Sequence, residues 1–226
     1  MNEYYFRALQ VFPNVEDKMD CLRGRAYWVR SKIGRFRCVD MRGCLLTYPS
    51  WEKHVKKAIR DLSKAGGLFV DVGANIGVLS VYASKLGFSV LALEPQPEVF
   101  AALQDNLAAN HVDGTAYRLA AWRERDTLRM KKDQKNLVLS KLDPAGDLEV
   151  QAITLDSLGV SPAVVKVDVE GAEVEVMRGM GKTLERAHPA LVYESYLGSK
   201  PAACRGFLKA FGYEVEKLDG INWLAL

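Results

Sequence analysis

The chain has 226 residues, of which 49% are hydrophobic and 26% charged, a composition typical of one globular domain with a buried core. No apolar run reaches the roughly 18 residues that would predict a membrane span, and residues 1–5 lack the basic and then apolar pattern of a signal peptide, so we expect a cytoplasmic protein. The formal net charge is only +3, but residues 1–66 carry 14 Lys and Arg against 7 Asp and Glu, which suits either an anionic partner or an ordinary solvated surface.

Residues 1–66 precede the regular part of the chain and contain aromatic clusters, basic residues and one predicted helix at 51–64. We interpret them as a cap on the substrate side, and we place a single core domain at 67–226. The sequence predicts no oligomeric state. The four cysteines show neither a CxxC pair nor a neighbouring His, so we expect reduced thiols and no zinc site.

From residue 68 onward, short apolar runs alternate with amphipathic stretches, a pattern typical of βαβ units around a mostly parallel sheet. Segment 123–152 has no helical period and contains Asp143-Pro144-Ala145-Gly146, so we predict hairpin strands and turns there. The last two runs flank Asp219-Gly220, which predicts an antiparallel hairpin. The predicted strands are 68–72, 88–93, 115–119, 163–167, 190–193, 213–218 and 221–226, and the predicted helices are 76–86, one from 97, 154–158, 173–187 and one that ends near 211.

The turn after the first of these strands has the features of a ligand site. Asp71-Val72-Gly73-Ala74-Asn75-Ile76-Gly77 leaves the strand and opens a helix, and ligands of open α/β sheets bind at such carboxyl ends. Gly73 and Gly77 would let the backbone approach a ligand closely. Glu94 ends the second strand, where its carboxylate could hold both hydroxyls of a ribose, and Pro95 turns the chain out of the sheet.

Two cofactors fit this pattern, and the chemistry of the turn separates them. NAD-binding proteins place a GxGxxG turn and a helix N-terminus on a pyrophosphate. Here the turn reads G-A-N-I-G, and Asp71 lies where it would repel a pyrophosphate. S-adenosylmethionine has no phosphate and carries an ammonium and a positive sulfonium, so acidic residues suit it better. The sequence favours S-adenosylmethionine, and an NAD-linked oxidoreductase is the remote alternative.

The run Val165-Lys166-Val167-Asp168-Val169-Glu170-Gly171-Ala172-Glu173, together with the glycine turn and Glu94-Pro95, resembles the FkbM family of methyltransferases. The resemblance covers roughly residues 67–195. It implies a Rossmann-like class I methyltransferase fold, an α/β architecture with a seven-stranded, mostly parallel sheet and a C-terminal antiparallel hairpin. It also implies S-adenosyl-L-methionine as the methyl donor and S-adenosyl-L-homocysteine as the product.

For individual residues, the resemblance implies a cofactor site and an adenine pocket. Ala121-Trp122 falls where the family lines the adenine pocket, and Asp168 ends a strand beside the transferring methyl group. The cofactor contacts that it implies come from Asp71, Gly73, Ala74, Asn75, Gly77, Glu94, Pro95 and Asp168.

Methyl transfer to a hydroxyl requires alignment and removal of a proton. Asp168 is the first candidate for this base, with Glu170 and Glu194 next, because all three are expected at the carboxyl ends of strands. The predicted helix 51–64 feeds the start of the first strand, so its own start is expected at the mouth of the pocket, together with Tyr48, Trp51, Glu52 and His54. His54 is a further candidate base there. Clustered carboxylates could also hold Mg²⁺, which would acidify a hydroxyl, but we expect no metal.

The sequence does not identify the methyl acceptor. The family resemblance implies O-methylation of a sugar, glycan or natural product, and N-methylation of a peptide or protein side chain is the alternative. Acceptors are therefore expected among small molecules, glycans and peptides. A nucleic acid is not expected, because no ladder of basic and aromatic residues accompanies the basic N-terminal segment.

Overall fold

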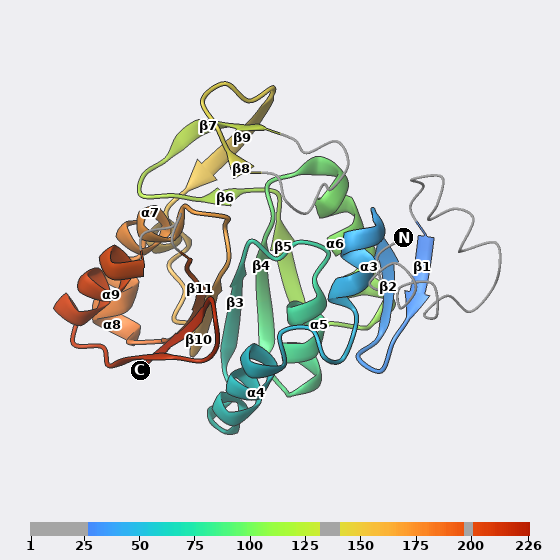
Figure 1. Ribbon diagram of the computed structural model, residues 1–226, viewed down its shortest axis with the longest axis horizontal. Coiled ribbons are helices and arrows are strands. Elements are labelled where there is room, and N and C mark those ends of the chain that lie inside the picture. The colour runs from blue at the N-terminus through green and yellow to red at the C-terminus, as the bar shows by residue number, and fades with distance from the viewer. Residues whose placement is uncertain (1–26, 132–140, 197–200) are drawn as a thin grey trace.

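The computed structural model describes residues 27–131, 141–196 and 201–226, and its centre is a seven-stranded sheet in the order β12-β13-β11-β10-β3-β4-β5 (Figure 1). Six strands run in the same direction, whereas β13 is antiparallel to both of its neighbours, β11 and β12. The predicted α/β fold with a C-terminal antiparallel hairpin is therefore confirmed. The strands are β3 (Leu68–Val72), β4 (Ser89–Leu93), β5 (Gly114–Tyr117), β10 (Val164–Val167), β11 (Ala190–Glu194), β12 (Val215–Lys217) and β13 (Asn222–Ala225).

Helices cover both faces of the sheet, and the side-chain alternation of each strand supplies a separate core to each face. In β3, Phe69 packs into the core under one layer, whereas Val70 and Val72 pack into the core under the other. The first layer contains α4 (Lys53–Leu62), α5 (Val78–Lys85) and α6 (Pro97–Ala109), and the second contains α7 (Glu173–Arg178), α8 (Gly181–Ala187) and α9 (Pro201–Ala210).

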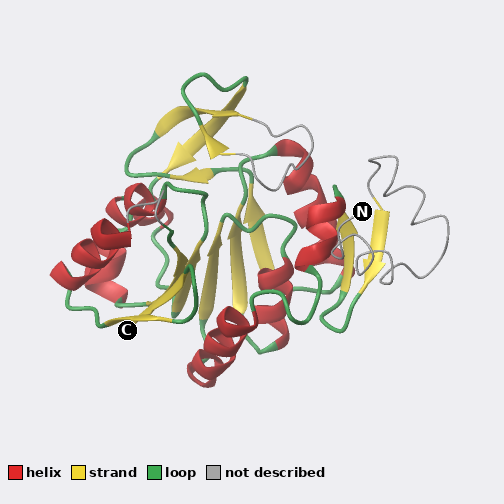
Figure 2. Cartoon of the chain, in the orientation of Figure 1, coloured by secondary structure: helices red, strands yellow, loops and turns green. Residues whose placement is uncertain are grey.

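A smaller four-stranded sheet, in the order β6-β9-β7-β8, lies beside one end of the main sheet (Figure 2). It agrees with the hairpin strands predicted for 123–152, because β7 pairs antiparallel with both β8 and β9. A 3₁₀ turn at Leu155–Leu158 then leads back to β10. The strands of the small sheet are β6 (Ala120–Ala121), β7 (Asp126–Lys131), β8 (Lys141–Leu142) and β9 (Leu148–Ile153).

The segment predicted as helix 173–187 contains two helices, with a break at Gly179-Met180, where the glycines of the sequence indicate an interruption. A Cβ at residue 179 would overlap the carbonyl oxygen of Trp122, so only glycine fits there. The carboxylate of Asp156 accepts from the backbone N–H of Lys182 at 3.0 Å and of Thr183 at 2.8 Å, which caps the N-terminus of α8.

The described part of the N-terminal segment forms a hairpin of β1 (Tyr27–Arg30) and β2 (Arg35–Cys38), followed by α3 (Met41–Leu46), α4 and the 3₁₀ turn Ser63–Ala65. Asn106 on α6 and Asn110, the C-cap residue of this helix, attach the hairpin to the core (Figure 1). Asn106 Nδ2 donates to the carbonyls of Arg37 at 3.0 Å and Ile76 at 2.8 Å, and Asn110 exchanges two hydrogen bonds with the backbone of Arg35. The division into a cap at 1–66 and a core at 67–226 stays a prediction.

Within the described residues, no helix has the length and apolarity needed to cross a membrane.

Candidate functional site

The turn between β3 and α5 follows an unusual backbone path at the carboxyl end of the sheet. Gly73, Asn75 and Gly77 all have positive φ, at 75°, 54° and 84°. Glycine and asparagine adopt this left-handed region at the lowest cost. A Cβ at Gly73 would overlap the carbonyl oxygen of Asp168, so the turn and the end of β10 pack backbone against backbone.

Glu94 ends β4 and is only 5% exposed. Its Oε2 accepts from the backbone N–H of Asn75 at 3.0 Å, and its Oε1 accepts from that of Gln96 at 2.9 Å. A carboxylate has about four acceptor positions, so both oxygens can still accept from a ligand. Burial raises the pKa of Glu94 to about 7, although the two backbone hydrogen bonds oppose the shift.

A buried charged pair, Asp71 and Lys166, links β3 to β10. The two residues are direct neighbours in the parallel register, and they are 1% and 6% exposed. Asp71 Oδ2 accepts from Ser80 Oγ at 2.6 Å, whereas its Oδ1 is buried and has no hydrogen-bond partner among the described residues. Burial by itself would lower the pKa of Lys166, but the charges of Asp168, Asp71 and Glu52 outweigh burial and raise it. Lys166 is therefore a permanent cation at the site.

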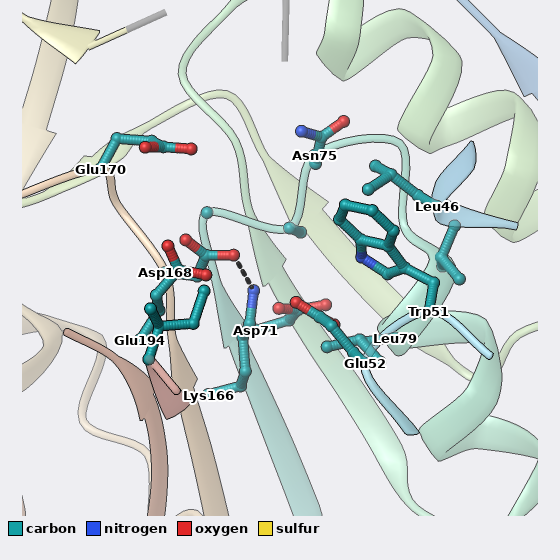
Figure 3. Close-up of a pocket in the computed structure, with 14 residues that line it drawn as sticks. Leu46, Trp51, Glu52, Asp71, Asn75, Leu79, Lys166, Asp168, Glu170 and Glu194 are labelled. Carbon is teal, nitrogen blue, oxygen red and sulfur yellow. Dashed lines mark hydrogen bonds and ion pairs between the residues drawn. The ribbon is translucent and has the colours of Figure 1, made fainter. Parts of the chain in front are cut away.

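A cavity of about 180 Å³ opens above this pair (Figure 3). Trp51 and Leu46 lie on one side of it, and Asp168 and Glu194 lie on the other (Figure 3). The structure thus brings residues from β3, β10, β11 and the N-terminal segment together. The lining residues are Leu46, Trp51, Glu52, Asp71, Gly73, Ala74, Asn75, Val78, Leu79, Lys166, Asp168, Glu170, Glu194 and Ile221.

Two smaller pockets continue from this cavity across the glycine turn. The first contains Asn75, Glu94 and Pro95, and it shares Gly73 with the cavity. The second is largely apolar and contains Ala121 together with Val72 and Val169. The three spaces form a route from the acidic cavity, past Glu94, to an apolar end.

Among the candidate bases, Asp168 and Glu194 differ in environment. Asp168 Oδ2 accepts from Lys166 Nζ at 3.0 Å, so this carboxylate is held by an ion pair (Figure 3). Glu194 ends β11, and burial followed by the charges of Asp168 and Glu170 raises its pKa to about 8. A carboxylate with a pKa near the working pH is the better proton acceptor.

Three of the predicted catalytic and cofactor-binding residues, His54, Trp122 and Gly77, do not line these spaces. His54 is exposed and is not among the residues that line the cavity. The side chain of Trp122 packs against the core of the small sheet, whereas its neighbour Ala121 lines the apolar pocket. The positions Asp71, Gly73, Ala74, Asn75, Glu94, Pro95, Asp168, Glu170 and Glu194 all line one of the three spaces. Gly77 lies beneath the turn and packs on Leu103.

Lys166 is a residue of the site that the sequence-based prediction missed. A signal for Lys166 exists, because a lysine in the apolar strand Val164–Val167 would be costly without a partner such as Asp71 in the adjacent strand. Trp51 and Glu52 are expected at the mouth of the pocket because helix 51–64 feeds the first strand, and both line the cavity.

Carboxylate oxygens of Glu52, Asp168 and Glu194 can lie within 4.8 Å of one another, a spacing that could suit a cation. The ammonium of Lys166 already lies 3.0 Å from Asp168 and supplies one positive charge to this cluster.

The family model of the methyltransferase FkbM domain matches residues 71–215, which contain most of this site. Hexuronic acid methyltransferase AglP of Haloferax volcanii is 28% identical over 183 residues, which cover 77% of this chain and 72% of AglP. The 31-O-demethyl-FK506 methyltransferase FkbM of Streptomyces tacrolimicus is 31% identical over 109 residues, which cover 47% of this chain and 41% of that protein.

Among solved structures, methyltransferase FkbM from Methylobacillus flagellatus has a TM-score of 0.51 at 18% identity, and the match covers 70% of this chain and 43% of that one. The Pyrococcus abyssi tRNA (uracil-54, C5)-methyltransferase in complex with S-adenosyl-L-homocysteine also has a TM-score of 0.51, at 17% identity, and the match covers 88% of this chain and 43% of that one. At these identities the two structures show a shared fold.

Proposed function

The chain belongs to the FkbM family of S-adenosylmethionine-dependent methyltransferases, and from that premise we propose that it methylates a hydroxyl of a sugar, a glycan or a natural product. The observation that carries the proposal is Glu194, a carboxylate with a raised pKa in a cavity beside the glycine turn. Such a group can take the proton that a hydroxyl loses. The family match decides against the NAD-linked oxidoreductase.

S-adenosylmethionine supplies a methyl group on a positive sulfonium. The free acceptor positions of Glu94 would accept hydrogen bonds from the ribose hydroxyls, and the unpartnered Oδ1 of Asp71 would accept a hydrogen bond from the ammonium of the methionine portion. The apolar pocket at Ala121 would hold the adenine. The left-handed turn from Gly73 to Gly77 exposes the backbone between these ends.

The acceptor would bind in the cavity of about 180 Å³, where the carboxylate of Glu194 would take the proton that the hydroxyl loses. Bound S-adenosylmethionine would supply the methyl group and leave as S-adenosylhomocysteine. Asp168 is held in place by its ion pair with Lys166 and would help to orient the acceptor. Lys166 also supplies a cation to the cluster, so we expect activity to be unchanged by a chelator such as EDTA.

Two relatives support oxygen as the acceptor atom, since one is named for hexuronic acid and the other for a 31-O position. The acidic cavity favours one alternative, an amine of a peptide or protein side chain, because carboxylates attract a cationic amine. A panel of hydroxyl and amine acceptors with labelled S-adenosylmethionine distinguishes the two, since the label stays on the acceptor's oxygen or nitrogen.

Calorimetric titration with S-adenosylmethionine, S-adenosylhomocysteine and NAD(H) tests the cofactor. We expect micromolar binding of the first two and none of NAD(H). Glu94→Ala should weaken S-adenosylhomocysteine binding about 10- to 100-fold, because one charge-assisted hydrogen bond contributes roughly 1.5–3 kcal/mol. Glu185→Ala, an exposed carboxylate on α8, is the matched control. Unchanged binding in Glu94→Ala would contradict the cofactor placement.

A further inference from the structure

One wall of the large cavity comes from outside the segment that the family model matches. Leu46, Trp51 and Glu52 precede residue 71, and Ile221 follows residue 215. A family that shares a cofactor keeps the cofactor site in its common part. Residues that this chain adds to the cavity from outside that part are therefore in the place where the acceptor is selected.

The turn that presents Trp51 and Glu52 is held in a costly conformation. Glu52 has a φ of 47° and a ψ of 41°, and a left-handed non-glycine residue costs about 1–2 kcal/mol. The buried ammonium of Lys56 donates to the carbonyl of Tyr48 at 3.1 Å and to that of Trp51 at 2.6 Å. These hydrogen bonds hold the turn from below, so the Glu52 carboxyl reaches the cavity.

The two side chains at this turn have complementary chemistry. Trp51 offers an aromatic surface on one side of the cavity, and Glu52 lies between it and Lys166 (Figure 3). An aromatic face packs against the C–H groups of a saturated ring, while carboxylates accept hydrogen bonds from the ring hydroxyls. A mostly apolar wall with a few converging polar groups is what a small polyhydroxylated ring needs.

The charge of the cavity restricts which ring can enter. Its lining contains the carboxyl groups of Glu52, Asp71, Asp168, Glu170 and Glu194, and Lys166 is the cation among the described lining residues. Burial raises the pKa of Glu52 to about 7, and the charge of Asp168 adds to this shift. Negative charge is already unfavourable here, so a further carboxylate on the acceptor would be repelled.

We propose that the acceptor is an uncharged polyhydroxylated ring of the hexose type, which stacks on Trp51, and that Glu52 excludes rings carrying a carboxylate. This inference rests on the proposed methyl transfer to a hydroxyl. Trp51 and Glu52, which lie outside the segment that the family model matches, would restrict the acceptor to neutral rings.

Matched pairs of methyl glycosides test the proposal. Each pair contains a neutral hexoside (gluco, galacto or manno) and the corresponding hexuronoside, and labelled S-adenosylmethionine reports methyl transfer. For the pair with the highest turnover we expect kcat/KM to favour the neutral member at least tenfold. Glu52→Gln should raise kcat/KM for the hexuronoside on the order of tenfold, because one repelling charge is removed.

Variants of Trp51 test the stacking surface. Trp51→Ala should raise KM for the neutral hexoside about tenfold, Trp51→Phe should recover part of this loss, and both should bind S-adenosylhomocysteine as the wild type does. Trp28→Phe is the control, because Trp28 lies on β1, where Arg35 stacks on its ring at 4.4 Å.

The outcomes separate the inference from the proposed function. Preference for a hexuronoside, equal KM values in Trp51→Ala and wild type, or no turnover of either member of any pair by a protein that binds S-adenosylhomocysteine would each overturn the inference alone. A wild-type protein that does not bind S-adenosylhomocysteine would overturn the proposed function itself.

Discussion

Two carboxylates at neighbouring strand ends, Asp168 and Glu194, illustrate how environment divides their roles. Asp168 has a lysine partner at 3.0 Å, whereas Glu194 lies among like charges and is half-buried. The sequence places both at the same edge of the sheet and favours Asp168 as the base. The ion pair with Lys166 already occupies Asp168, and the raised pKa of Glu194 favours Glu194 as the base instead.

The pH dependence of turnover tests this division. A base must be ionised to act, and the pKa of Glu194 is raised to about 8 by burial and by Asp168, Glu170 and Glu52, with Lys166 opposing them. We therefore expect kcat to rise as the pH increases through about 8. Glu194→Gln should lower kcat roughly 100-fold or more and remove this rise. Glu170→Gln, which keeps Glu194, should preserve the rise, and a flat profile in the wild type would contradict the assignment.

Replacing Gly73 should destabilise the protein in two ways, through backbone strain and through a steric clash, and a comparison with Gly87 separates the two effects. Its φ of 75° makes any side chain unfavourable, and a Cβ would also overlap the Asp168 carbonyl. Gly87 has a φ of 94° but nothing within 4 Å of its Cβ position, so Gly87→Ala measures strain alone. We expect Gly87→Ala to cost about 1 kcal/mol of unfolding free energy and Gly73→Ala to cost clearly more, with weaker binding of S-adenosylhomocysteine. Equal losses of unfolding free energy for the two variants in chemical denaturation would show that the contact between Gly73 and the Asp168 carbonyl does not limit the size of residue 73.

At the scale of elements, the predicted strands and helices largely agree with the structure because their signals are local. An apolar run such as 68–72 between glycines predicts a strand from its own residues. The glycines of the segment from Gly179 to Gly181 indicate that the helix is interrupted, but the position of the break depends on Trp122 and Asp156, which are distant in sequence. The sequence therefore predicts the order of elements better than their ends.

The parts of the site that could be predicted are those whose signals lie in the local sequence and in the order of the strands. The glycine turn and Glu94 belong to segments whose order places them at one edge of the sheet, so the sequence suffices. The order of helix 51–64 and the first strand also predicts that Trp51 and Glu52 lie at the mouth of the pocket. Which way the Glu52 carboxyl points depends on its left-handed backbone and on the packing of α4 against α5 and β11, and these leave no pattern in the sequence.

Helix α6 offers a test of how the N-terminal hairpin is attached. Asn106 is fully buried and satisfies Arg37 and Ile76 through three hydrogen bonds, so it joins β2 to the glycine turn. Asn106→Leu should leave these backbone groups unpaired and lower the unfolding free energy by roughly 3 kcal/mol or more. Asn110→Ala removes partners from a partly exposed site and should cost about 1 kcal/mol. Urea denaturation measures both, and an Asn106 variant as stable as wild type would show that the hairpin is held by packing alone.

The whole molecule carries an excess of buried acidity at one end of its sheet. Glu52 and Glu94 have pKa values raised to about 7 and Glu194 to about 8, in each case first by burial. A carboxyl group whose pKa is higher in the folded state than in the unfolded state binds more protons when folded. Its contribution to stability is therefore present at low pH and is lost as the pH rises through the folded pKa. The clustered carboxylates suit a cationic ligand, but they lower the stability of the ligand-free protein at neutral pH.

We accordingly expect the unfolding free energy of the free protein to fall by about 1 kcal/mol per pH unit between pH 5 and 7.5, a slope discounted because two of the three groups are half-exposed. The range ends at pH 7.5 because burial lowers the pKa of Lys56 to about 8. Above that pH the loss of the Lys56 proton in the folded state would raise the unfolding free energy and oppose the fall. Glu52→Gln should flatten the slope, and Glu185→Ala should not.

Because Glu94 accepts ribose hydroxyls best when ionised, saturating S-adenosylmethionine should raise the melting temperature more at pH 7.5 than at pH 5.5. Thermal unfolding across this range measures both effects, and a stability that rises with pH would mean that the cavity carboxylates are ionised without cost.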